Sequence, residues 1–194
     1  RGKDGYEVHG LLVKPASYER GRKYPALLRI HGGPSCCQDS HAFNIEREVL
    51  AASGYVVIAA NYRGSRGRGE AHQSAIAKEG KGKEITDQYT PDSSHAPWKN
   101  PEAWVKRSYV FFHANQIRTP TLFLGGDRDF NVPIAGSEQM YVALKSLGVP
   151  TELIIYPDQH HNISMPSYKK DRLERYVAWY DKYVKGAPAT DVGM

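Results

Sequence analysis

Acidic and imidazole side chains occupy two segments that each follow a short apolar run. Asp127 and Asp129 stand in "GGDRDFNVP" after "TLFL", and His160 and His161 stand in "YPDQHHNIS" after "ELIIY". If the two apolar runs are neighbouring parallel strands, these segments leave the same edge of the sheet and lie close together. A carboxylate beside an imidazole fixes its tautomer and stabilises the imidazolium, as a general base requires. The pattern therefore predicts an acid–base pair between the two loops.

A third candidate is "HGGP" at 31–34, which follows the apolar run "ALLRI". Two successive glycines allow the backbone to approach a ligand and direct its N–H groups at it. A simple tight turn would explain the same residues. The motif taken alone leaves both interpretations open.

Other chemistries find less support in the sequence. Neither an H-E-x-x-H motif nor a Cys/His quartet is present, and adjacent histidines point in different directions, so we predict no metal site. The net charge is +5, but Lys and Arg are scattered, and "RGSRGRG" at 63–69 lacks the interleaved aromatics of a nucleic-acid platform. No apolar run approaches the ~18 residues of a membrane span. We therefore expect neither a nucleic-acid partner nor a membrane partner.

The start of the chain and its two cysteines say little about compartment or cross-linking. It begins with "RGKDGYEV", without Met or an apolar signal segment, so we expect a piece of a longer polypeptide and assign no compartment. Cys36 and Cys37 are neighbours and cannot join distant segments, so we expect no disulfide framework. We expect two reduced thiols, and the less favoured alternative is a strained disulfide between these two neighbours.

The strands and helices that hold these loops can be predicted from the spacing of apolar residues along the sequence. Short continuous apolar runs predict strands buried on both faces. Amphipathic stretches that stop at glycines predict helices between or after them. Alternation of strand and helix predicts an α/β fold with a mostly parallel sheet and helices on both faces. "YEVHGLLVKP" alternates better and predicts an antiparallel edge strand. The predicted strands are 26–30, 56–60, 121–124 and 152–156, and the predicted helices are 44–53, 136–147 and 171–184.

The middle of the chain does not fit this plan. Residues 71–119 contain no convincing buried strand and include "GKGK" and "TPDSSHAPWKNP". So long a stretch without structure is uncommon inside a compact domain. Either the element assignment or the continuity of the chain is therefore in question.

Taken together, the motifs resemble one family. "LLRIHGGP", "VVIAANYRGSRGRGE", "PWKNPEAW", "RTPTLFLGGDRDFNVPI" and "SEQMYVALKSLGVPTELIIYP" are similar to the α/β-hydrolase domain of the prolyl oligopeptidase family. The resemblance is strongest to its acylaminoacyl-peptidase and dipeptidyl-peptidase-like branches. It covers nearly the whole chain except the middle. It implies an α/β-hydrolase fold over residues 1–194.

The resemblance assigns roles to individual residues. Asp129 matches the triad acid, four positions before the proline of "VP". His161 matches the triad base, although "NI" follows it where the family usually has Gly and an apolar residue. Gly33 matches the backbone donor of the oxyanion hole. His160 and Asp127 are then neighbours of the triad.

The nucleophile of that family is missing from the sequence. The family carries it in a G-x-S-x-G elbow, and this sequence contains no such motif. Ser65 belongs to "NYRGS", upstream of the elbow, and is not a substitute. We predict a missing segment near residues 79–87, on the order of 50 residues or more from typical element lengths. Either the sequence joins two stretches that are separated in the intact protein, or the polypeptide truly lacks the segment.

The function implied by the resemblance is a serine hydrolase or peptidase that cleaves short peptides by acyl transfer. Such an enzyme needs no cofactor, and its partner is a peptide substrate. The propeller domain that normally precedes this domain is not part of the sequence. The alternative is a truncated, non-catalytic remnant that acts as a structural or assembly piece. The sequence predicts no oligomeric state.

Overall fold

The computed structural model describes residues 1–2, 5–33, 37–78, 101–102 and 110–186. By its internal contacts the chain divides into two compact units, Arg1–Lys83 and Glu84–Met194. The segment at 79–87, where residues are expected to be missing, lies outside the described residues.

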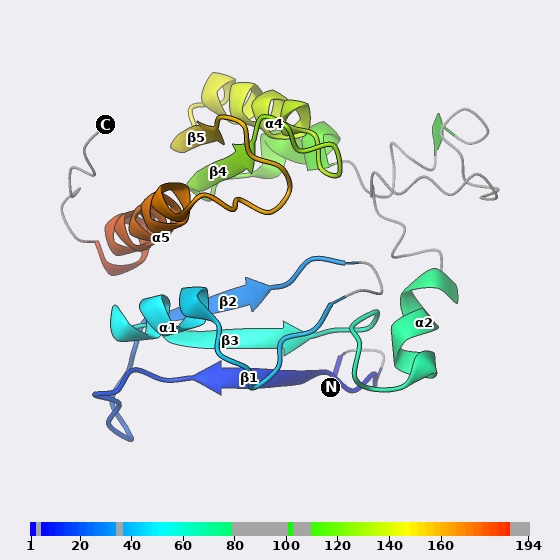
Figure 1. Ribbon diagram of the computed structural model, residues 1–194, viewed down its shortest axis with the longest axis vertical. Helices are drawn as coiled ribbons and strands as arrows, with labels where there is room; N and C mark the ends of the chain where they lie inside the picture. Colours follow the sequence, from blue (N-terminus) through cyan, green and yellow to red (C-terminus); the bar gives the residue numbers. More distant parts are fainter. Residues whose placement is uncertain (3–4, 34–36, 79–100, 103–109, 187–194) are drawn as a thin grey trace. The chain divides into compact units, whose positions relative to one another are not determined.

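The first unit is built on a three-stranded sheet in the order β1-β3-β2 (Figure 1). β2 (Ala26–Ile30) pairs in parallel with β3 (Val56–Asn61), and β1 (His9–Val13) pairs antiparallel with β3 at the edge. Both the predicted parallel strands and the predicted antiparallel edge strand are therefore confirmed. The last described element of this unit is α2 (Glu70–Lys78).

Helix α1 (Ile45–Ala52) packs against β3 and begins where the sequence predicts. Its N-cap is Asn44, whose side chain accepts the Arg47 N–H at 3.1 Å and so satisfies one of the free donors of the first turn. Its buried residues are Arg47, Leu50 and Ala51, whereas Ile45 is exposed.

The opposite face of this sheet is open among the described residues. Leu28, Ile30 and Ile58 are 61%, 66% and 40% exposed, and Leu28 pairs directly with Ile58. The expectation that these strands are buried on both faces is therefore wrong for the described part of the unit. A continuous apolar run indicates that both faces suit burial, but it does not supply the element that covers them.

The second unit contains two parallel strands, β4 (Thr121–Gly126) and β5 (Thr151–Tyr156). They are connected by α4 (Ile134–Ser146), and β5 is followed by α5 (Pro166–Tyr180) and a short π-helix, η2 (Asp181–Lys185). Leu144 of α4 is fully buried and packs with Val149 and with Ala114 of the 3-10 helix η1 (Val110–Gln116). The predicted strands and helices of this half are present, and the mostly parallel α/β fold class is confirmed.

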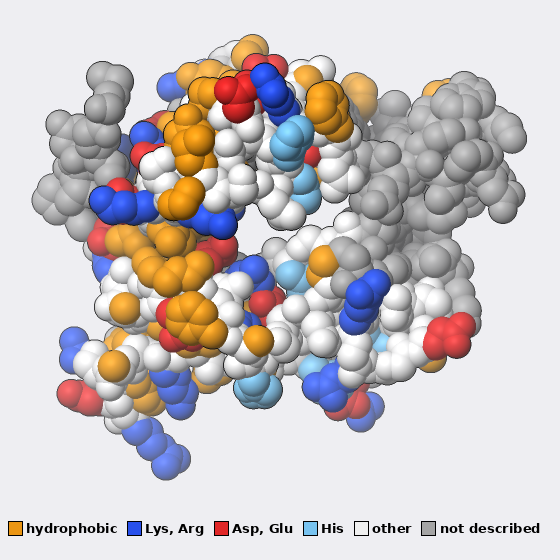
Figure 2. All heavy atoms as spheres, viewed as in Figure 1, with side chains coloured by type: hydrophobic (Ala, Val, Ile, Leu, Met, Phe, Trp, Pro, Cys, Tyr) orange, Lys and Arg blue, Asp and Glu red, His pale blue; other side chains and the backbone are white. Residues whose placement is uncertain are grey.

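Three further observations concern the described residues as a whole. Lys and Arg side chains are interspersed with Asp and Glu on the face drawn in Figure 2. None of the described helices is long and apolar enough to cross a membrane. Cys37 is disulfide-bonded, so the expectation of a reduced thiol is wrong for this residue.

Candidate active site

The loops that follow β4 and β5 are held together by their backbones. The Arg128 N–H donates to the carbonyl of Gln159 at 3.0 Å, and the Arg128 side chain reaches Asp158 at 2.5 Å. Gly126, the last residue of β4, allows this approach: a Cβ there would lie 2.1 Å from the Gln159 carbonyl oxygen. Only glycine fits at such a distance, since the obstacle is backbone. The parallel pairing of the two strands thus brings the two loops together, as predicted.

Asp129 and His161 form a hydrogen bond across these loops. Asp129 Oδ2 lies 2.8 Å from His161 Nδ1, within the expected range. Asp129 Oδ1 accepts the backbone N–H groups of Asn131 and Val132 at 2.9 and 2.8 Å. The Asp129 side chain is only 9% exposed, whereas that of His161 is 52% exposed. The carboxylate is therefore fixed from inside the loop, and the imidazole faces outward from it.

The same contacts govern the charge on Asp129. Burial is the largest single influence and raises the pKa of the carboxyl. The N–H of Val132, the hydrogen bond from His161 and the N–H of Asn131 act in the opposite direction. Together with the nearby His161 charge they outweigh burial, so the pKa of Asp129 lies below its ordinary value of 3.8. Asp129 is ionised at neutral pH.

An ionised partner decides the tautomer of His161. A carboxylate only accepts hydrogen bonds, so Nδ1 carries the proton and Nε2 carries the lone pair in the neutral ring. No described residue hydrogen-bonds to Nε2. The arrangement suits a base: a proton taken up at Nε2 would create an imidazolium beside the Asp129 carboxylate.

His160 and Asp127 are placed differently. His160 Nδ1 donates to the backbone carbonyl of Arg128 at 2.9 Å, and the ring lies near Phe130. Asp127 is exposed, and its backbone N–H donates to the carbonyl of Tyr156. Among the described residues, neither side chain takes part in a carboxylate–imidazole pair, so the geometry favours Asp129 and His161 over their neighbours.

Gln159 is a buried residue of this loop that the sequence analysis did not single out. Its Oε1 accepts the backbone N–H groups of Ser164 and Met165 at 2.9 and 3.2 Å. Its Nε2 donates to the Asp158 carbonyl at 3.1 Å, beside the left-handed backbone of Asp158 (φ 57°). One side chain therefore holds both ends of the turn that carries His161. The only sequence signal is a long polar residue directly before the two histidines.

A hydrogen bond between β5 and α5 stabilises the loop that connects them. The Tyr156 hydroxyl, at the end of β5, donates to Asp171 Oδ2 at 2.8 Å, and Arg175 Nε contacts the same oxygen at 2.8 Å. Burial, and then the Asp171 carboxylate, raise the pKa of Tyr156 far above its ordinary value, so it stays a donor. The segment carrying His161 is thus anchored where it leaves β5 and where it enters α5.

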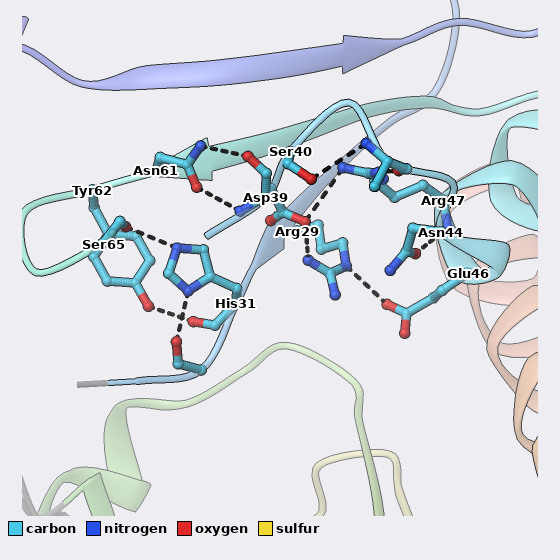
Figure 3. Close-up of polar contacts among 12 residues, drawn as sticks. Arg29, His31, Asp39, Ser40, Asn44, Glu46, Arg47, Asn61, Tyr62 and Ser65 are labelled. Atoms are coloured by element: carbon cyan, nitrogen blue, oxygen red, sulfur yellow. Dashed lines mark hydrogen bonds and ion pairs between the residues drawn. The ribbon is translucent and has the colours of Figure 1, made fainter. Parts of the chain in front are cut away.

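The "HGGP" segment follows β2 in the first unit, and its surroundings are shown in Figure 3. His31 contacts the Gly32 carbonyl through Nδ1 at 2.6 Å and Ser65 Oγ through Nε2 at 2.8 Å. The Tyr62 hydroxyl donates to the His31 carbonyl oxygen. Gly33 follows on the exposed side of this turn. A Cβ at Gly32 would meet no heavy atom within 4 Å, so the turn is open on that side among the described residues.

The chain beyond this turn is fixed by buried Asp39. Its Oδ1 lies 2.5 Å from Arg29 and 3.4 Å from Arg47. Its backbone N–H and carbonyl exchange hydrogen bonds with the Asn61 side chain, each at 2.7 Å (Figure 3). A buried carboxylate is tolerated because two guanidinium groups face it. The network ties β2, β3 and α1 to the segment that leaves the turn.

No group of three or more His, Cys, Asp or Glu side chains suited to a metal occurs among the described residues. The chemistry that the geometry supports is proton transfer at His161 Nε2.

Comparisons with known proteins identify the family of the chain. The sequence model of the prolyl oligopeptidase family matches residues 41–91 and 89–187, in two parts. The uncharacterized peptidase YuxL of Bacillus subtilis (strain 168) is 28% identical over 249 residues, covering 93% of this chain and 38% of YuxL. Dipeptidyl-peptidase 5 of Porphyromonas endodontalis is 21% identical over 243 residues, covering 90% of this chain and 35% of that protein. The chain thus spans well under half the length of these relatives.

A solved structure shows the same fold. An acylaminoacyl peptidase in complex with Z-Gly-Gly-Phe-chloromethyl ketone superimposes with a TM-score of 0.76 at 18% identity. The match covers 96% of this chain and 41% of the peptidase. The fold is that of the α/β-hydrolase peptidases, in partial form. Because the family model matches most of its length, this chain belongs to the prolyl oligopeptidase family.

Proposed function

We propose that this chain is part of a serine peptidase that cleaves short peptides by acyl transfer, with a nucleophilic serine outside the present sequence. The observation that carries the proposal is the pair of Asp129 and His161, at 2.8 Å, on adjacent strand exits. His161 Nε2 has no hydrogen-bond partner among the described residues, as a base awaiting a nucleophile requires. Membership of a peptidase family supports the same reaction.

The reaction follows from the chemistry of these groups. The serine oxygen attacks the peptide carbonyl carbon while its proton passes to His161 Nε2. Asp129 stabilises the resulting imidazolium, and the Gly33 N–H donates to the negative oxygen of the tetrahedral intermediate. His161 then protonates the leaving amine as the C–N bond breaks. Water then attacks the acyl-enzyme carbonyl carbon while its proton passes to His161 Nε2. The bond from that carbon to the serine oxygen breaks, the serine oxygen takes the proton back from His161, and the acid is released.

Peptides are the substrate class that the relatives support. The acylaminoacyl peptidase was solved with a peptidyl chloromethyl ketone, and relatives carry the name dipeptidyl-peptidase. We therefore propose short peptides as substrates.

Three observations support a missing segment in the middle of the chain. The alignment with YuxL extends over 249 residues, more than the 194 of this whole chain, so the relative has residues without counterparts here. The family model matches in two separate parts, residues 41–91 and 89–187, which overlap only at 89–91. Leu28, Ile30 and Ile58 form an open apolar face on the first sheet, as expected when a covering element is absent.

Two tests separate the peptidase from the alternative, a truncated non-catalytic remnant. The intact mass of the natural protein should exceed 21.7 kDa if a segment is missing, whereas equality would favour the remnant. The intact protein should also be labelled by a fluorophosphonate probe on one serine and should hydrolyse an N-acylated tripeptide anilide, with no effect of a metal chelator. A protein of larger mass that neither reacts with the probe nor cleaves the anilide would overturn the proposal.

A further inference from the structure

Both ring nitrogens of His31 are occupied (Figure 3). A carbonyl oxygen only accepts, so the 2.6 Å contact with the Gly32 carbonyl places the proton on Nδ1. In the neutral ring the Ser65 hydroxyl then donates to Nε2, at 2.8 Å. The imidazole thereby joins Ser65 to the backbone of the turn.

The ring of His31 is also held from the side. The Tyr62 ring stacks on it at 4.7 Å between centroids and 16° between planes, and the Tyr62 hydroxyl bonds the His31 carbonyl. The Tyr62 carbonyl in turn accepts the Ser65 N–H and His72 Nε2, each at 3.0 Å. Ser65 is fully buried. These contacts leave the imidazole one orientation.

A serine hydroxyl on a histidine nitrogen could also be a nucleophile with its base. Two observations speak against that role. Ser65 has 0% exposure, so no substrate carbonyl can reach its oxygen. The other His31 nitrogen bonds a neutral carbonyl, whereas His161 bonds the Asp129 carboxylate. The pair has the geometry of a structural support.

The support bears directly on Gly33. A trans peptide is planar, so the C=O of Gly32 and the N–H of Gly33 lie in one plane and point in opposite directions. Two adjacent glycines would otherwise rotate freely about φ and ψ. We propose that His31 is a positioning residue: by binding the Gly32 carbonyl, with Ser65 fixing its other nitrogen, it orients the Gly33 N–H toward the oxyanion. The inference rests on the proposed function of Gly33 as the oxyanion donor.

The test uses the intact protein and a graded set of variants. His31→Ala frees the peptide plane but keeps the donor. Its kcat should fall about tenfold to a hundredfold, less than the ~10²–10³-fold for removing an oxyanion donor, with little change in KM. His31→Asn should recover most of this loss, since its amide N–H can replace Nδ1 as donor to Gly32. Ser65→Ala should cost a few-fold. His41→Ala, which removes an exposed histidine of the same unit, is the matched control and should equal the wild type.

A second readout follows the backbone itself and needs no activity. In the wild type, NMR should show His31 with its proton on Nδ1. The ¹⁵N order parameter of the Gly33 amide should fall from about 0.85 toward 0.6 in His31→Ala. Ser65→Ala should give a smaller fall and His41→Ala none. This measurement stays decisive if a variant loses stability, provided that the first unit remains folded.

The outcomes separate the inference from the proposed function. A wild-type protein that neither hydrolyses peptides nor reacts with fluorophosphonate overturns the function of Gly33, and the inference falls with it. An active wild type whose His31→Ala variant keeps kcat within twofold, or keeps a rigid Gly33 amide, overturns the inference alone. Loss of kcat together with a mobile Gly33 amide, and recovery in His31→Asn, supports it.

Discussion

His161 in the second unit and His31 in the first are both histidines at the end of a parallel strand, yet they are used differently. His161 bonds a carboxylate through Nδ1 and leaves Nε2 without a described partner. His31 bonds a backbone carbonyl through Nδ1 and a buried hydroxyl through Nε2. The first ring can accept a proton with compensation from Asp129. The second has no nitrogen left for a substrate.

The two environments show why partner type matters more than position in a motif. Both rings have their proton on Nδ1, but a carboxylate stabilises an imidazolium much more than a neutral carbonyl does. His160 extends the comparison, because its Nδ1 also bonds a carbonyl, that of Arg128. We therefore expect proton transfer from His161 and orientation of the backbone from His31. The following predictions test this division in the intact protein.

Removing the His161 ring should have the largest effect. His161→Ala eliminates the base, and kcat should fall by up to about 10⁶-fold, as when the histidine of a serine-protease triad is removed. Steady-state hydrolysis of a peptide anilide measures it. His160→Ala is the matched control and should keep most of the activity, since its ring bonds only a backbone carbonyl. Equal losses in the two variants would contradict the assignment of the base.

Asp129→Asn should cause the second largest loss of kcat. The amide can donate to Nδ1 and so favour the wrong tautomer of His161, and kcat should fall by something like 10⁴-fold. The control is Asp127→Asn, which alters an exposed carboxylate outside the pair and should leave kcat nearly unchanged. Comparing kcat for the two variants shows which carboxylate acts with His161. A larger loss in Asp127→Asn would transfer the acid role to that residue.

Gly126→Ala should disturb the Asp–His loops without touching either side chain. Its Cβ would lie 2.1 Å from the Gln159 carbonyl, and the backbone must move. We expect a loss near the upper end of ~1–3 kcal/mol in the free energy of unfolding, with reduced kcat. Urea unfolding measures the first quantity. In contrast, Gly136→Ala has open space in α4 and should stabilise by ~0.5–1 kcal/mol. Similar destabilisation by both would contradict the close approach of the loops.

Gln159→Ala should have a smaller effect on the same loop. It removes the acceptor for the Ser164 and Met165 N–H groups, which corresponds to about 1–2 kcal/mol in the free energy of unfolding. A several-fold fall in kcat should accompany it. Gln159→Glu keeps the acceptor but loses the donor to Asp158. Its unfolding free energy and kcat should therefore lie between those of the wild type and Gln159→Ala. Gln116→Ala, at an exposed glutamine, should match the wild type. An unchanged kcat in Gln159→Ala would show that the turn holds His161 without it.

The smallest expected effect is a pH dependence of stability. The pKa of Asp129 is lowered in the folded protein, so its contribution is present above the ordinary value of 3.8. It is lost as pH falls through the lower folded pKa. The difference in unfolding free energy between wild type and Asp129→Asn should therefore be constant above about pH 5 and shrink below 3.8. Urea titrations from pH 2 to 6 test this. A gap that widens on acidification would contradict the lowered pKa.

Most strands and helix ends were predictable because they depend on neighbouring residues in the sequence. Continuous apolar runs predicted all four parallel strands, and Gly54, Gly148 and Gly186 mark helix ends with left-handed backbone, where glycine meets no steric penalty. The side-chain alternation of the opening segment predicted the antiparallel edge. Placement of acidic and imidazole residues after two such runs predicted that their loops meet. The exposed face of β2 was not predicted, because burial of one strand face depends on residues elsewhere in the chain.

The sequence by itself determined the family motifs and the strand–helix alternation, since these depend on residue type and short spacing. The candidate set Gly33, Asp129 and His161 is what the resemblance to the family implies. Only the tertiary structure decided which groups bond. Asp129 and His161 are 32 positions apart, and His31 and Ser65 are 34 apart. The strength of a hydrogen bond depends steeply on the distance between donor and acceptor. Strand register and the path of the loop backbone therefore determine which groups are close enough to bond. For that reason one histidine of this chain is left ready to accept a proton and another is held at both nitrogens.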